Sequence, residues 1–179
     1  MKTLEFRTAK VEDIAPIVTL VNSAYRGETS KQGWTTEADL LDGQRTDAGK
    51  IAEIIADNSQ ILLVGFAGER MVSSVNLSQK DGRCYLGMLT VDPQEQSQGW
   101  GRQTIAAAEN FAQKHWNFQV MHMTVISVRE ELIAYYLRRG YRPTGEQIEF
   151  PMNDPRFGIP KRQDFHLMVL SKSLPIAEN

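Results

Sequence analysis

The chain has 179 residues, of which 41% are hydrophobic and 23% charged, so it is long enough and apolar enough to bury a sizeable core. Its net charge of −2 argues against a nucleic-acid-binding protein, and its longest apolar run, residues 61–67, is far shorter than the ~20 residues that span a bilayer. A single cysteine and the charged start Met-Lys-Thr-Leu-Glu-Phe-Arg indicate neither a disulfide framework nor an export signal. We therefore expect one cytoplasmic domain, 1–179, that binds neither nucleic acid nor membrane.

The predicted elements alternate between strands and helices without an internal repeat. In chain order they are a strand at 3–7, helices at 11–25, 35–41 and 48–56, strands at 60–67, 71–78 and 83–91, a helix at 103–112, a strand at 118–126, a helix at 130–139, and strands at 141–150 and 165–170. Pro16 should loosen or bend the first helix, and Gly68-Glu69 and Asp81-Gly82 are hairpin signals. This order predicts an α/β (α+β) fold: a mixed, largely antiparallel sheet of about seven strands with helices on both faces.

A glycine-containing loop joins the strand that ends at Val91 to the helix that follows Arg102. Pro93 ends the strand, and Gly99 and Gly101 let the backbone turn so that several N–H groups face one point. The helix dipole adds positive potential at that point. The loop therefore predicts a phosphate or pyrophosphate site, although the same glycines also suit a turn that binds no ligand.

The residues that the loop lacks narrow the choice of ligand. A nucleotide-binding P-loop needs a Lys-Ser/Thr pair after the last glycine, and a dinucleotide fingerprint needs a third glycine, so a nucleotide-binding protein is disfavoured. The remaining pattern is Gln96-x-x-Gly99-x-Gly101 after a Val-x-Pro strand end. It resembles the Arg/Gln-x-x-Gly-x-Gly/Ala loop of the GNAT superfamily of N-acetyltransferases, which binds the pyrophosphate of acetyl-CoA.

A second pattern supports the same resemblance about forty residues later. The sequence Tyr136-Leu-Arg-Arg-Gly140-Tyr141 ends a predicted helix with a glycine C-cap. It is similar to the Tyr-x-x-x-Gly-Phe/Tyr signature of the GNAT superfamily. The resemblance covers nearly the whole chain, although only the two signatures are specific, and it implies a single N-acetyltransferase domain.

The resemblance implies an acetyl-CoA-dependent transfer to a primary amine of a small molecule, an amino-acid-like amine among the options. The alternative is an acyl-CoA-binding module without turnover. By the same resemblance the pantetheine arm lies along Leu89, Thr90 and Val91. The pyrophosphate loop then consists of Gln96, Ser97, Gln98, Gly99, Trp100, Gly101 and Arg102. We expect no metal, because the three histidines lack the spacing of a metal site.

Tyr136 is the predicted general acid, because a phenol with a reference pKa near ~10 suits protonation of a departing thiolate. A tyrosine packed on a helix face would show the same pattern. Tyr135 is the weaker candidate because it lies about 100° round the helix. The general base stays open: the stretch 84–90 lacks the glutamate of many relatives, with Tyr85 in its place, and Arg129 replaces their asparagine. His122 is a conceivable base.

The acceptor side is predicted only by two unusual loops. Tyr25, Arg26 and Trp34 belong to a polar loop with aromatic ends, in which Arg26 can pair with a substrate carboxylate between two aromatic walls. The second loop, 150–162, is a candidate lid whose cations, Arg156, Lys161 and Arg162, can meet an anionic acceptor or the CoA 3′-phosphate. Local packing and solvated charges explain both loops equally well. The acyl chain length and the oligomeric state stay open, a homodimer among the options.

Overall fold

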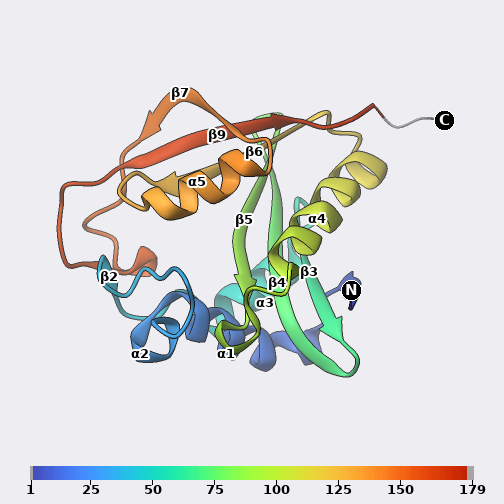
Figure 1. Cartoon of the computed structure of the whole chain (residues 1–179), viewed down its shortest axis with the longest axis horizontal. Coiled ribbons are helices and arrows are strands. Elements are labelled where there is room, and N and C mark those ends of the chain that lie inside the picture. Colours follow the sequence, from blue (N-terminus) through green and yellow to red (C-terminus); the bar gives the residue numbers. More distant parts are fainter. Residues whose placement is uncertain (1, 177–179) are drawn as a thin grey trace.

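The computed structural model describes residues 2–176 and contains a seven-stranded sheet (Figure 1). Across the sheet the strands are β1 (Glu5–Thr8), β3 (Gln60–Ala67), β4 (Arg70–Lys80), β5 (Arg83–Val91), β6 (Val120–Ile126), β9 (Leu167–Ser173) and β7 (Arg142–Ile148). Only the β5–β6 pair is parallel, and the other five neighbouring pairs are antiparallel. The predicted fold class is confirmed.

Helices cover both faces of this sheet (Figure 1). They are α1 (Ile14–Tyr25), the short α2 (Gly27–Ser30), α3 (Ala48–Ala56), α4 (Trp100–Trp116) and α5 (Glu130–Arg138). Strand β3 shows why two layers form, because its alternate residues point to opposite faces: Leu62 packs in the cluster of α1 and α3, and Leu63 in that of α4 and α5. No helix among residues 2–176 combines the length and apolar composition needed to cross a membrane.

Most predicted elements are found close to their expected positions. Helix α3 has the predicted bounds, and the side chain of Asp47 caps it by accepting a hydrogen bond from the Lys50 N–H at 2.9 Å. Helix α1 begins at Ile14 after a 3₁₀ turn at Val11–Asp13, so Pro16 lies in the first turn, where its missing N–H removes no helical bond. Local signals suffice for these elements.

The predicted helix at 35–41 is wrong. The chain makes one turn there and then forms β2 (Leu41–Asp42), which pairs with β8 (Ile159–Pro160) in a separate two-stranded sheet. Pairing with a segment more than a hundred residues away overrides the local helical pattern, because backbone hydrogen bonds to a partner strand outweigh a weak propensity. The four-residue helix α2 was not predicted, because it is too short to show a periodic pattern.

The sheet opens between β5 and β6. The two strands pair only at Cys84 with Met121 and at Tyr85 with His122, and beyond these residues they have no further register. Met88 has a positive φ of 52°, and the β4–β5 register shifts between Ser74 and Asn76, which together indicate a bulge in β5. The opening leaves the last part of β5 without a neighbour on its β6 side.

Candidate active site

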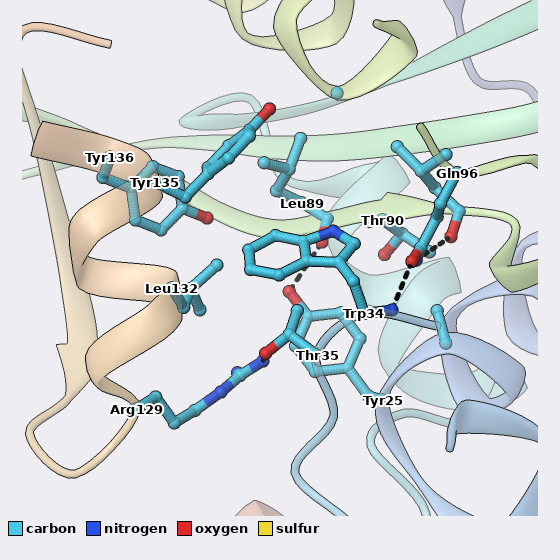
Figure 2. A pocket seen from close by; sticks show the side chains of 13 residues that line it. Tyr25, Trp34, Thr35, Leu89, Thr90, Gln96, Arg129, Leu132, Tyr135 and Tyr136 are labelled. Carbon is cyan, nitrogen blue, oxygen red and sulfur yellow. Dashed lines mark hydrogen bonds between the residues drawn. The ribbon is translucent and has the colours of Figure 1, made fainter. Parts of the chain in front are cut away.

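Three adjoining cavities follow the open side of β5. The strand-gap cavity lies between the separated ends of β5 and β6 and has a volume of about 230 Å³. The central pocket lies between the Tyr25–Thr35 region, the end of β5 and helix α5 (Figure 2). The loop-end hollow lies at the start of α4, against the last turn of α5. The central pocket shares lining residues with both others, so the three cavities form one path past β5.

The loop before α4 is shaped to bind an anion. Ser97 and Gly99 both have positive φ values, 69° and 78°, which turn successive N–H groups in one direction. Within residues 2–176, no backbone N–H of residues 97–102 donates to a protein acceptor, and these groups stand at the N-terminus of a 17-residue helix. Arg138 and Arg139 line the same hollow. The residues present therefore fit a pyrophosphate.

The side chains of two predicted loop residues are engaged within the protein and are not available to a ligand. The Trp100 side chain is buried in the core beside Leu4 and Val72, so only its N–H can reach a ligand. Gln96 uses its side chain within the protein: Oε1 accepts from the Trp34 N–H at 2.9 Å, and Nε2 donates to the Val91 carbonyl at 3.3 Å (Figure 2). Gln96 thereby connects the loop of residues Gln96–Arg102, called the anion loop below, to the segment that carries Trp34.

The end of β5 has no neighbouring strand on its β6 side, although side chains already bond the carbonyls of Leu89 and Val91. Leu89 and Val91 are half-buried and line the central pocket, whereas the Thr90 hydroxyl is buried and donates to the Met88 carbonyl at 3.0 Å. The Leu89 carbonyl accepts a hydrogen bond from the Tyr25 hydroxyl at 2.7 Å (Figure 2). An edge of this kind can pair with an amide-bearing chain as it would with another strand.

The Tyr136 hydroxyl faces the middle of this path. The residue is only 6% exposed, and the ring points toward Leu89 across the central pocket (Figure 2). Among the described residues, its hydroxyl has no hydrogen-bond partner. Burial raises the pKa of Tyr136 well above its ordinary value, so the phenol keeps its proton at neutral and mildly alkaline pH.

Tyr135 also lines the path, which corrects the expectation that its ring points away from the site. Its ring stacks against Trp34 at 5.3 Å between centroids, and a Cβ on Gly101 would lie 2.7 Å from its hydroxyl oxygen. Both tyrosines reach the cavities because they lie on either side of Leu132, on the one face of α5 that lines the central pocket. Tyr136 extends toward the strand-gap cavity, and Tyr135 toward the loop-end hollow.

Arg26 has a partner that the sequence did not suggest. Its Nε and Nη2 donate to Oε2 of Glu37 at 3.1 and 2.9 Å, and the guanidinium also reaches the carbonyls of Asp42 and Phe157. Oε1 of Glu37 accepts from Arg129, at the start of α5, at 3.1 Å. Arg26 therefore offers no free fork to a substrate carboxylate, and we do not retain that role for it.

The two loops predicted for the acceptor side do reach the site. Trp34 lies in the central pocket and the loop-end hollow, and Phe157 of the second loop lines the strand-gap cavity. The cations of the second loop are occupied differently from the prediction, because each pairs with a nearby carboxylate. The pairs are Arg156 with Asp154, Lys161 with Asp42, and Arg162 with Asp164.

Candidates for a general base are scarce. Within residues 2–176, Glu37 is the only carboxylate that lines the three cavities, and both of its oxygens bond arginines. His122 lies opposite Tyr85, at the last position where β6 pairs with β5. Within residues 2–176 it is not among the residues that line these cavities. Burial and the nearby Arg83 lower the pKa of His122.

Comparison with known proteins agrees with this geometry. Residues 35–151 match the family model of the acetyltransferase (GNAT) domain, which is more than half of the chain. The chain belongs to the GNAT acetyltransferase family. The matched segment begins before β2 and ends after β7, so it contains the anion loop, the end of β5 and Tyr136. As a member of this family, the protein is an acyltransferase that uses a CoA thioester.

Solved structures share the GNAT fold at low sequence identity. They include spermidine N-acetyltransferase from Vibrio cholerae in complex with CoA and spermine, with a TM-score of 0.71, 15% identity and 97% of each chain covered. PaiA N-acetyltransferase from Thermoplasma acidophilum, in complex with CoA, has a TM-score of 0.70 and 14% identity, with 96% of this chain and 99% of that one covered. A comparison with curated protein sequences finds no match.

The left-handed conformation of Gly99 leads to a first prediction for this GNAT protein. Gly99→Ala is expected to weaken CoA binding about tenfold or more, because a side chain at a φ of 78° strains the turn that aims the N–H groups. Isothermal titration calorimetry with CoA measures the effect. Gly68→Ala is the matched control: its φ is 64°, with open space round the added Cβ as at Gly99, but it lies in the β3–β4 hairpin. Equal CoA affinity in the two variants would contradict the assignment of the loop.

Proposed function

We propose that this protein transfers the acetyl group of acetyl-CoA to the primary amine of a small molecule. The observation that carries the proposal is the arrangement along one path: a loop whose N–H groups at 97–102 have no acceptor within residues 2–176, the end of β5 at Leu89–Val91 without a strand on its β6 side, and the hydroxyl of Tyr136 facing it. The pyrophosphate would lie at residues 97–102 and the pantetheine amides along β5. The acceptor amine would enter from the strand-gap cavity, whose small volume suits a small molecule.

Tyr136 can supply the proton that the leaving group of this reaction requires. The amine nitrogen attacks the thioester carbonyl carbon, the carbon–sulfur bond breaks, and the departing thiolate takes a proton from Tyr136. The amine loses one proton, and solvent restores the proton of the phenol, so that an N-acetyl amine and CoA thiol are the products. The raised pKa of Tyr136 means that the hydroxyl still carries its proton when the thiolate leaves.

Among residues 2–176 no carboxylate without an arginine partner lines the cavities, which favours an amine that needs little help to lose its proton. An α-amino group is less basic than a lysine-type amine, with a pKa near ~8 at a peptide N-terminus and a higher one beside a free carboxylate, against ~10.4 for lysine, so its neutral fraction at neutral pH is larger. Water in the strand-gap cavity can accept the proton from such an amine. This supports an acceptor of the α-amino class.

A screen of amino acids and amines with acetyl-CoA, following the release of free thiol, tests the proposal. We expect amine-dependent thiol release and an acetylated product of the corresponding mass. A protein that binds acetyl-CoA tightly but acetylates no amine across a broad panel would instead be an acyl-CoA-binding module. Thiol release that does not depend on an amine would indicate thioester hydrolysis.

The pH dependence of the reaction provides a second prediction. With an α-amine acceptor, kcat/KM should rise about tenfold per pH unit below the pKa of the amine and then level off, because only the neutral amine attacks. The raised pKa of Tyr136 keeps the acid form present, so no fall is expected up to about pH 9.5. Initial rates at low acceptor concentration across this range measure the profile. A descending limb near pH 8 that disappears in Tyr136→Phe would contradict the assignment of a raised pKa.

A further inference from the structure

The strand-gap cavity carries more positive than negative charge. Three arginines and one glutamate line it, and its other lining side chains are uncharged. Glu37 uses both carboxylate oxygens on Arg26 and Arg129. The third arginine, Arg45, has no carboxylate within ion-pair distance among the described residues. The cavity therefore contains a cation that has no partner of opposite charge in the part of the chain that the structure describes.

Hydrogen bonds hold the backbone at Arg45, whereas its guanidinium makes none within residues 2–176. The Asn22 Oδ1 atom, on α1, accepts from the N–H groups of Arg45 and Thr46 at 2.8 and 3.1 Å, and Asn22 Nδ2 donates to the Thr46 carbonyl at 2.9 Å. The guanidinium carbon of Arg45 lies over the Tyr25 ring, 5.4 Å from its centroid. Arg45 is half-buried and makes no side-chain hydrogen bond within residues 2–176. Its fork is available to a ligand.

Tyr25 links Arg45 to the reacting end of the path. The hydroxyl of Tyr25 bonds the Leu89 carbonyl at 2.7 Å, and its ring lies under Arg45. A small molecule with its amine near Leu89 and Tyr136 and its other end over the Tyr25 ring would bring that end to Arg45. Apart from Thr124, the remaining side chains of the wall are apolar or aromatic and include Leu41, Leu86, Met88, Met123 and Phe157.

We infer that the acceptor is an amino carboxylate with an apolar body, such as a hydrophobic amino acid, and that Arg45 binds its carboxylate. This inference rests on the proposed function for the role of the amine. A guanidinium binds a carboxylate through two parallel charge-assisted hydrogen bonds, which fixes the orientation of the ligand as well as its charge. A polyamine is disfavoured, because its additional positive charges would face Arg45 and Arg129 without a free carboxylate.

Matched acceptors and matched variants test this inference. L-phenylalanine and L-methionine are compared with their carboxamides and with spermidine, for the wild type, Arg45→Gln and Lys80→Gln. For the amino acids, Arg45→Gln should raise KM about 10- to 100-fold with little change in kcat, because an ion-pair contact to the ground state is lost. For the carboxamides, Arg45→Gln should change KM little. Comparing the variants on one substrate removes the difference in amine pKa between acid and amide.

Lys80 is an exposed lysine at the end of β4, outside the three cavities, and Lys80→Gln should leave the KM for both kinds of substrate unchanged.

The outcomes separate this inference from the proposed function. Better use of spermidine by the wild type, or equal losses for acid and amide in Arg45→Gln, would overturn the carboxylate site while leaving an N-acetyltransferase. If no amine is acetylated, calorimetry of L-phenylalanine and L-methionine with the CoA-saturated protein decides the inference. Binding that weakens in Arg45→Gln but not in Lys80→Gln would support the carboxylate site although the proposed function fails. Absence of binding would overturn it.

Discussion

Replacing Tyr136 by phenylalanine is expected to lower kcat about 100-fold while leaving the affinity for acetyl-CoA nearly unchanged. The hydroxyl donates its proton only as the thiolate leaves, so its loss affects the transition state and not the binding of the cofactor. The Tyr136 hydroxyl has no partner among the described residues, so the variant should also keep its stability. Steady-state rates with an identified amine and a calorimetric titration with acetyl-CoA measure the two effects.

Tyr141→Phe is a better control for this experiment than Tyr135→Phe, because Tyr135 touches the same path. The Tyr141 ring is fully buried next to Tyr136, with centroids 6.1 Å apart, but it lines none of the three cavities. Its hydroxyl donates to Glu109 at 2.9 Å. Tyr141→Phe should therefore keep kcat and lose about 1 kcal/mol of stability, the opposite pattern to Tyr136→Phe. Wild-type kcat in Tyr136→Phe would show that another group protonates the thiolate.

The Glu37→Gln variant is expected to lose about 3 kcal/mol of folding free energy, because it leaves two buried guanidinium groups without a negative partner. Arg26, Glu37 and Arg129 are all less than a tenth exposed, so solvent cannot replace the missing charge. Removing one member of a buried ion cluster costs more than the net value of the cluster, since the remaining charges stay desolvated. Denaturation by urea, followed by circular dichroism, measures the change in the free energy of unfolding.

A second glutamate in the same region serves as the control. The Glu28 side chain is 90% exposed and bonds Lys31 at 3.1 Å, so Glu28→Gln should change the free energy of unfolding by less than about 0.5 kcal/mol. If Glu37→Gln were as mild as Glu28→Gln, the buried cluster would not hold together the acceptor side of the path. In that case Arg26 would again be available as a ligand for the acceptor.

The functional signatures could be read from the sequence because they depend on neighbouring residues. Gly99 marks a left-handed residue before a helix, which the structure confirms with a φ of 78°. Gly140 ends α5 with a φ of 96°, as the C-cap pattern predicted. The hairpin turns at Gly68 and at Asp81-Gly82 likewise need positive φ values and have them. Each of these features is decided within a few residues by backbone conformation.

The contacts on the acceptor side of the path could not be predicted from neighbouring residues in the sequence. Glu37 meets Arg129 across 92 positions of the chain, and β2 meets β8 across more than a hundred, so no local pattern indicates either contact. The assignment of Arg26 to a substrate carboxylate was mistaken for this reason, since a lone arginine in a loop carries no sign of its partner. Arg45 belongs to no sequence motif, and only its position over the Tyr25 ring in the structure indicates a role in binding the acceptor.

The sequence by itself determined the layered sheet and the turns at Gly99 and Gly140, because hydrophobic periodicity and turn chemistry are properties of short segments; the anion-binding role of Gln96–Arg102 and the acid role of Tyr136 stay predictions. The tertiary structure decided which charged groups remain free. Electrostatic pairing depends on distances between segments far apart in the chain and on their shared burial. A short stretch of sequence indicates neither of these. Only the folded structure therefore shows that Arg26 is paired with Glu37, and that Arg45 has no carboxylate partner among residues 2–176.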